Sequence, residues 1–211
     1  YDKRIPSNLT VEQILIRSGN IGSVRIGQKL EIDKLKFFLE KIGVLNKIKF
    51  DIEEVGVPIP FRWGKCKLAT VSFGHGITTT PLQLAKGYAI IANGGFDINP
   101  SLIKKSLKEK HKQKRIIKEG VSKQINEILR KIVTTKEGTA GFANIEGYEV
   151  GGKTGTAEKA VIGGYTRKAK VNTFASIFPT SKPKYVMIVL LDEPKTSEDY
   201  IYYYKNKSGS Y

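Results

Sequence analysis

Three strand-like segments near the end of the chain constrain its fold more than any other feature. They are expected at residues 148–158, 171–178 and 185–191, and the last two are alternating or wholly apolar. Helical patterns occupy most of the sequence before them. Helices followed by adjacent strands predict an α+β domain whose antiparallel sheet is flanked by helices. At 211 residues the chain is long enough for one domain or for a piece of a larger one.

The helical part opens with a short helix. Thr10-Val-Glu-Gln13 has the spacing of a capping box, and the helix is expected to break at Ser18-Gly19-Asn20. Apolar residues with a period near 3.6 and helix start and stop signals predict four more helical stretches. These cover residues 21–30, 32–42, 80–94 and 122–134. Residues 44–70 are expected to be mostly loop, and 96–118 an excursion with short strands and a basic run from Lys104 to Lys118.

Composition narrows the possible partners and cofactors. The chain has 36 Lys and Arg against 20 Asp and Glu, a formal net charge of +16. These basic residues are spread over the whole chain, which favours lysine-rich solvated faces over a dedicated nucleic-acid surface. Cys66 is the single cysteine and there are two histidines, so we expect neither a disulfide framework nor a metal centre, and no cofactor. The longest apolar runs, such as 186–191, are too short to cross a bilayer.

The first predicted strand carries a Lys-Thr-Gly sequence. Gly151 and Gly152 precede Lys153-Thr154-Gly155, and Thr156 follows. Glycines weaken a strand unless something must approach its backbone closely, as a peptide added at a sheet edge does. Lys153 then supplies fixed charge, and the threonine hydroxyls can bond a carboxylate. The alternative is a glycine-softened edge strand with an exposed lysine.

Ser18-Gly19-Asn20 is a second, weaker signal. Ser and Asn are common at helix ends and turns, so the tripeptide alone predicts only a cap or turn. Its position upstream of Lys153-Thr-Gly matches the order of the Ser-Asp-Asn-type and Lys-Thr-Gly elements in enzymes with an active-site serine that recognise penicillin.

Four ordered blocks carry a family resemblance. They are Thr10 to Gly22, Val71 to Gly95, Val150 to Glu158 and Leu191 to Pro194. Together they resemble the transpeptidase domain of class B penicillin-binding proteins, and more closely the cell-division subgroup than the elongation subgroup. The match extends over nearly the whole of residues 1–211, which would form part of one such domain. The implied fold is that of the penicillin-recognising serine transpeptidases, incomplete at both ends.

The resemblance implies a reaction and roles for particular residues. A serine would attack the D-Ala-D-Ala end of a peptidoglycan stem peptide, and a second stem peptide would resolve the acyl-enzyme into a cross-link; β-lactams would acylate the same serine. Ser18, Asn20 and Lys153 would be catalytic, and Thr154, Gly155 and Thr156 would bind substrate. Division proteins would be partners. The site would face the periplasmic side of a bacterial inner membrane, with any anchor outside this segment.

The sequence departs from the family pattern at the nucleophile. A Ser-x-x-Lys element is expected before Ser18, and residues 1–17 contain none. The two later matches, Ser101 to Lys104 and Ser181 to Lys184, fall beside a proline or in a proline-containing turn, so the nucleophile is expected outside this segment.

Three alternatives stay open. They are a basic nucleic-acid-binding module, a relative that binds penicillin without catalysis, and a carboxypeptidase or β-lactamase of the same superfamily. The block from Gly76 to Ala85 argues against the last of these, by resemblance.

Overall fold

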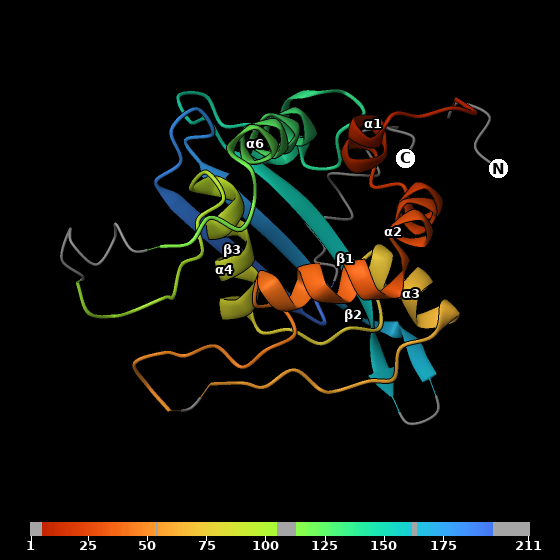
Figure 1. Ribbon diagram of the computed structural model, residues 1–211. Coiled ribbons are helices and arrows are strands. Elements are labelled where there is room, and N and C mark those ends of the chain that lie inside the picture. The colour runs from red at the N-terminus through yellow and green to blue at the C-terminus, as the bar shows by residue number, and fades with distance from the viewer. Residues whose placement is uncertain (1–5, 54, 105–112, 162–163, 196–211) are drawn as a thin grey trace.

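A computed structural model of the chain describes residues 6–53, 55–104, 113–161 and 164–195, and it confirms the α+β class. Figure 1 shows α4 and α6 lying over the sheet, α1 and α3 on its β1 side, and α2 running from beside α1 towards α4. The elements are α1 (Val11–Ile16), α2 (Asn20–Lys41), α3 (Lys65–Ser72), α4 (Pro81–Ala92), α6 (Glu119–Thr134), the 3₁₀ helix η1 (Gly141–Ala143), β1 (Gly151–Val161), β2 (Gly164–Phe178) and β3 (Tyr185–Asp192).

The strands form an antiparallel sheet in the order β1-β2-β3, as predicted. Its register places Lys153 opposite Ala175 and Thr154 opposite Phe174, on alternate faces of the sheet. β2 begins at Gly164, seven residues before the predicted start at 171. The added part is polar and basic, so it has no apolar alternation that could indicate a strand.

The turn between α1 and α2 positions Ser18. α1 has the predicted capping box. The Thr10 hydroxyl accepts from the backbone N–H of Gln13 at 3.2 Å, and the backbone N–H of Thr10 donates to the side-chain Oε1 of Gln13 at 2.9 Å. Ser18 then adopts a positive φ of 54°, and α2 starts at Asn20. The two predicted helical stretches after it join in α2, which has a kink at Glu31.

Residues 44–70 are mostly loop, as predicted, but α3 begins within them at Lys65, and the sequence did not indicate this helix. Only Leu68 and Val71 of this helix are buried, and its N-cap, Gly64, provides no side-chain cap. Tertiary packing stabilises it instead: Gly27 of α2 lies so close to Ser72 that a Cβ on Gly27 would stand 1.8 Å from the Ser72 hydroxyl. A local sequence pattern could not reveal this contact.

The main core lies between the helices and the sheet. Its buried members are Ile16, Leu129, Ile132, Val133, Ala140 and Ile177. They come from α1, from α6, from the loop after α6 and from β2, so burial of these side chains fixes α1 and α6 against the strands.

The predicted excursion at 96–118 includes a short antiparallel bridge between Phe96 and Arg115. The Arg115 guanidinium also lies over the Phe96 ring, 4.4 Å from its centroid. Residues 105–112 of the basic run lie outside the described residues.

Candidate active site

Folding brings Ser18 and Lys153 into direct contact although 135 residues separate them in sequence. The Lys153 ammonium donates to the Ser18 hydroxyl at 2.7 Å and to the Thr154 carbonyl at 2.8 Å. Ser18 is exposed, whereas Lys153 is half-buried. The contact joins the α1–α2 turn to β1, the two segments that carry the sequence-predicted site residues.

The electrostatics of Lys153 differ from those of a surface lysine. Burial lowers the pKa of Lys153 from its ordinary value of 10.5 to about 8, because desolvation disfavours the charged ammonium. A lysine with such a pKa releases its proton much more readily near neutral pH than an exposed one. The group can therefore take part in proton transfer with the hydroxyl that it contacts.

The glycines of β1 differ in their surroundings, and Gly152 is closely approached by the paired strand β2. A Cβ on Gly152 would stand 2.6 Å from Cζ of Phe174 and 2.7 Å from the Ala175 carbonyl oxygen. Gly155 is different, because it is exposed and its Cβ would meet only the Thr173 carbonyl oxygen at 4.0 Å. The space beside Gly155 is thus open to a bound molecule.

β1 also has an edge that no described strand pairs with, since the sheet order is β1-β2-β3. An extended peptide can add to such an edge through main-chain hydrogen bonds. Gly155 and Thr156 are exposed along this strand, and Thr154 is half-buried. The arrangement suits a peptide whose terminal carboxylate lies near the threonine hydroxyls.

Asn20 occupies the first position of α2, two residues after Ser18, and it is exposed. Within the described part of the chain, no hydrogen bond joins its side chain to another residue. The structure therefore brings Ser18 and Lys153 together, and Asn20 follows Ser18 by two residues with its side chain exposed to solvent.

Thr139 belongs to the site but was not predicted from sequence. Its hydroxyl lies 2.8 Å from the hydroxyl of Thr154, and it comes from the loop between α6 and η1. Its only sequence signal is Gly138-Thr139-Ala140, three small residues shortly after the end of α6, and small residues in such a place ordinarily indicate only a turn.

The two later Ser-x-x-Lys matches lie outside helices, as expected. The Ser101 hydroxyl donates to the Asp51 carboxylate at 2.7 Å, and the Ser181 hydroxyl bonds the Glu149 carboxylate. Neither serine stands one helical turn from its lysine on a helix, the arrangement that the nucleophile element requires.

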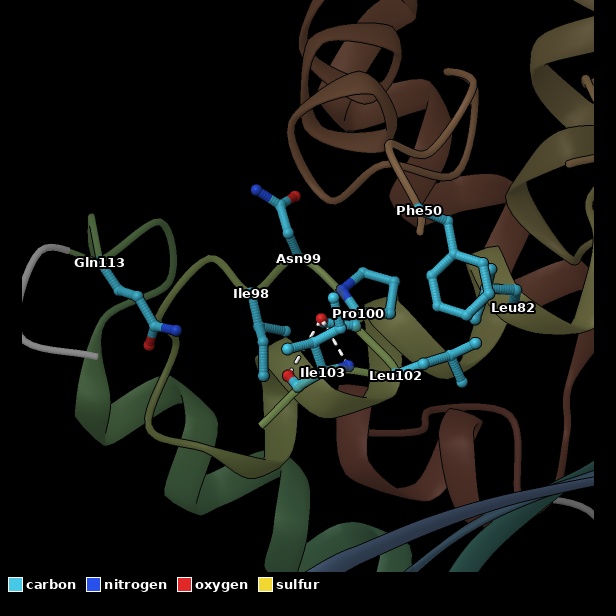
Figure 2. Close-up of a pocket in the computed structure, with 9 residues that line it drawn as sticks. Phe50, Leu82, Ile98, Asn99, Pro100, Leu102, Ile103 and Gln113 are labelled. Carbon is cyan, nitrogen blue, oxygen red and sulfur yellow. Dashed lines mark hydrogen bonds between the residues drawn. The ribbon is translucent and has the colours of Figure 1, made fainter. Parts of the chain in front are cut away.

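A separate cavity of about 470 Å³ lies beside the start of α4 (Figure 2). Its lining includes Phe50, Leu82, Ile98 and Leu102, with Asn99, Ser101 and Gln113 as its polar side chains. None of the lining residues is ionisable, and neither Ser18 nor Lys153 is among them. The cavity therefore offers no acid, base or nucleophile pair for catalysis.

Among the residues that the structure describes, His75 and Cys66 form no second centre. His75 packs its ring against Tyr165, with centroids 4.5 Å apart, and not against Lys153. Cys66 is exposed at the start of α3. Among the described residues no group of three or more His, Cys, Asp and Glu could hold a metal ion, and none of their helices is long and apolar enough to cross a membrane.

Comparison with known proteins identifies the family. The model of the penicillin binding protein transpeptidase domain matches residues 1–209. The chain belongs to this transpeptidase family. The resemblance to class B penicillin-binding proteins is thereby confirmed, and so is the sheet-and-helix fold that it implied.

The curated relatives of this penicillin-binding transpeptidase domain are longer proteins. The chain is 32% identical over 196 residues to the probable peptidoglycan D,D-transpeptidase FtsI of Caulobacter vibrioides, covering 89% of the chain and 33% of that protein. It is 34% identical over 199 residues to stage V sporulation protein D of Bacillus subtilis, covering 88% of the chain and 30% of that protein. The chain thus spans about a third of the length of these two relatives.

Solved structures agree with the fold. The transpeptidase domain of Burkholderia pseudomallei penicillin-binding protein 3 superposes with a TM-score of 0.83 at 27% identity, over 91% of the chain and 59% of that structure. Penicillin-binding protein 3 of Mycobacterium tuberculosis in complex with aztreonam superposes with a TM-score of 0.78 at 25% identity, over 88% of the chain and 45% of that structure.

Proposed function

We propose that this chain is part of a serine D,D-transpeptidase that cross-links peptidoglycan stem peptides through an acyl-enzyme and is itself acylated by β-lactams. The contact of the Lys153 ammonium with the Ser18 hydroxyl, beside an open glycine-containing strand, is the observation that carries the proposal. Family membership and relatives named peptidoglycan D,D-transpeptidases support it.

In the proposed reaction a serine hydroxyl attacks the carbonyl carbon of the penultimate D-Ala. The bond from that carbon to the nitrogen of the terminal D-Ala breaks, and the proton lost by the serine ends on the departing amine. Ser18 relays a proton to this nitrogen, and Lys153 tunes the relay because its pKa is lowered to about 8. A neighbouring stem-peptide amine then attacks the ester and releases the serine.

In this proposal, residues of β1 and of the start of α2 bind the substrate. The Thr154 and Thr156 hydroxyls donate to the substrate carboxylate, and Gly155 leaves room for the peptide main chain. Asn20 bonds the amide groups of the peptide. The Thr156 N–H donates to the oxyanion of the tetrahedral intermediate, together with the N–H of the nucleophile.

The nucleophile itself is proposed to come from sequence outside these 211 residues. Ser101 and Ser181, the serines of the two Ser-x-x-Lys matches, are both bonded to carboxylates on non-helical segments. Neither hydroxyl has a hydrogen bond to a lysine in the described part of the chain, so neither shows the Ser–Lys pairing of the nucleophile element.

Two further proposals concern the surroundings of the enzyme. We place the domain on the periplasmic side of the bacterial inner membrane, where its substrate is found, with proteins of the division machinery as partners. The relative named FtsI supports the division context, and the aztreonam complex of a relative supports the β-lactam as a ligand.

A fluorescent penicillin followed by denaturing electrophoresis tests the proposal. We expect covalent labelling of the full-length gene product and none of the 211-residue chain. Lys153→Ala in the full-length protein should lower the labelling rate by at least tenfold, since the relay loses its cation. The matched control is Lys184→Ala, which removes an exposed lysine from the turn before β3.

Two outcomes would contradict parts of the proposal. Labelling of the 211-residue chain would show that its nucleophile lies within it. A full-length protein that binds penicillin only reversibly would instead be a non-catalytic relative.

A further inference from the structure

We propose that Thr139 is a positioning residue that orients the hydroxyl of Thr154, and that the loop carrying it joins the two sides of the site. The inference rests on the proposed function, because it concerns how Thr154 presents its proton to a carboxylate. Thr139 itself acts through Thr154.

The direction of the hydrogen bond follows from the ligand. The two hydroxyl oxygens lie 2.8 Å apart, and either can be the donor while the site is empty. A carboxylate has no proton to give, so Thr154 must donate to it and can then only accept from Thr139. The result is a chain from Thr139 through Thr154 to the carboxylate, in which each hydrogen bond polarises the next.

The loop is built to hold Thr139 in place. A Cβ on Gly138 would stand 2.0 Å from the Ile132 carbonyl oxygen, so only glycine permits this approach. The same carbonyl accepts from the Ala140 N–H at 3.3 Å, and Ala140 is buried in the main core. The residues on both sides of Thr139 are therefore fixed to the end of α6.

The same loop also contacts the opposite side of the site. The Glu137 carboxylate lies 3.9 Å from the Arg17 guanidinium, and Arg17 directly precedes Ser18. Two residues later Thr139 bonds Thr154, which directly follows Lys153. Residues 137–139 therefore connect to the chain neighbours of both partners in the Ser18–Lys153 contact.

A double-mutant cycle separates action through Thr154 from direct contact with the ligand. Thr139→Val and Thr154→Val, singly and together, are compared in the full-length protein for acylation by a fluorescent penicillin. Valine keeps the shape of threonine and removes the hydroxyl. We expect Thr139→Val to weaken the binding step before acylation roughly fivefold and to leave the limiting acylation rate nearly unchanged.

The cycle should be strongly non-additive. In the Thr154→Val background, Thr139→Val should have an effect below about twofold, because the hydroxyl that it orients is gone. Thr139→Ser should restore the binding step. The matched control is Thr134→Val near the same loop, since the exposed Thr134 hydroxyl donates to the Arg130 carbonyl of its own helix and to no other described residue. Fully additive losses would overturn the proposal.

A second readout does not depend on catalysis. The three-bond couplings of the Thr154 side chain, measured by NMR with labelled threonine, report whether its χ1 angle is fixed. We expect one rotamer in the wild type and in Thr139→Ser, and averaging over rotamers in Thr139→Val. An unchanged rotamer in Thr139→Val would overturn the inference. A wild-type protein that penicillin does not acylate would overturn the proposed function alone.

Discussion

Two opposing effects act on the charged Nζ of Lys153. Its Nζ gains hydrogen bonds to the Ser18 hydroxyl and the Thr154 carbonyl, while burial removes part of its hydration. Neither partner carries a negative charge, so neither repays the desolvation of the ammonium as a carboxylate would. This imbalance lowers the pKa and makes the lysine a usable proton-transfer group.

The lowered pKa of Lys153 predicts a stability that depends on pH. Between about pH 8 and 10.5 the unfolded chain retains a proton that the folded chain has released, so rising pH favours folding. Below about pH 8 Lys153 is protonated in both states, and the folded state bears the full cost of burying the charged ammonium. Relative to Lys153→Met, the wild type should therefore gain free energy of unfolding as the pH rises from 8 towards 10.5.

Urea unfolding of both proteins from pH 7 to pH 10 measures this difference. Lys184→Met, at an exposed position, controls for loss of a lysine as such. A difference between wild type and Lys153→Met that stays constant over this range would show that burial does not disfavour the charged form.

Replacement of a β1 glycine by alanine should have different effects at Gly152 and at Gly155. Gly152→Ala would force a methyl group against Phe174 and the Ala175 carbonyl, and should lower the free energy of unfolding by about 1–3 kcal/mol. Gly155→Ala has room in the fold and should change stability by less than about 0.5 kcal/mol. It should nevertheless slow acylation of the full-length protein, because the methyl group occupies the space proposed for the substrate.

Thermal unfolding and fluorescent-penicillin labelling measure the two effects on the same variants. Equal losses of stability at the two positions would argue against a strand that is closed at Gly152 and open at Gly155.

At the residue scale, sequence indicated Ser18 and Lys153 but not Thr139. The first two stand in short motifs whose order in the chain matches a known constellation. Thr139 has no such motif, because its contribution depends on a hydrogen bond to a strand fifteen residues later and on a loop shaped by Gly138. Side-chain contacts of this kind depend on tertiary structure and produce no periodic pattern in the sequence.

At the element scale, α2 combines two helical stretches in one element. They meet at Glu31, whose φ of 66° and ψ of 170° are tolerated well only by glycine. Glu31→Gly should therefore raise the free energy of unfolding by roughly 1 kcal/mol, after the greater freedom of glycine in the unfolded chain is subtracted. Glu31→Ala keeps the restriction on φ and should give no such gain.

Chemical denaturation of the two variants beside the wild type measures the effect. An equal gain from alanine would mean that the glutamate side chain, and not the backbone conformation, is unfavourable at this position.

Elements with strong local signals were predictable, and those formed by packing were not. α1 and α4 each begin with a capping box made by a threonine and a glutamine three residues later. α3 lacks a side-chain cap and buries two apolar residues, and the outer part of β2 is held by pairing with β1. Partners distant in sequence stabilise both, so local patterns could not define them.

At the scale of the whole molecule, the two faces of β3 differ. Val186 points towards the main core, where the helices pack. Alternate side chains point away from it, and Tyr185, Met187, Val189 and Leu191 expose 60%, 45%, 40% and 55% of their area. The described residues thus place a row of large apolar side chains in solvent, whereas Val186 and Ile188 on the opposite face of the same strand are half-buried.

An apolar row of this size predicts that the isolated 211-residue chain binds a hydrophobic dye and self-associates. Replacing Met187 and Leu191 together by lysine should reduce both dye fluorescence and the apparent mass in sedimentation, because the apolar surface is interrupted and made to repel itself. Helix content should stay the same, since neither side chain reaches the core. Asn144→Lys adds charge at an exposed polar site and should leave dye binding unchanged. A cooperative thermal transition without dye binding would instead show that this face of the sheet is covered in the isolated chain.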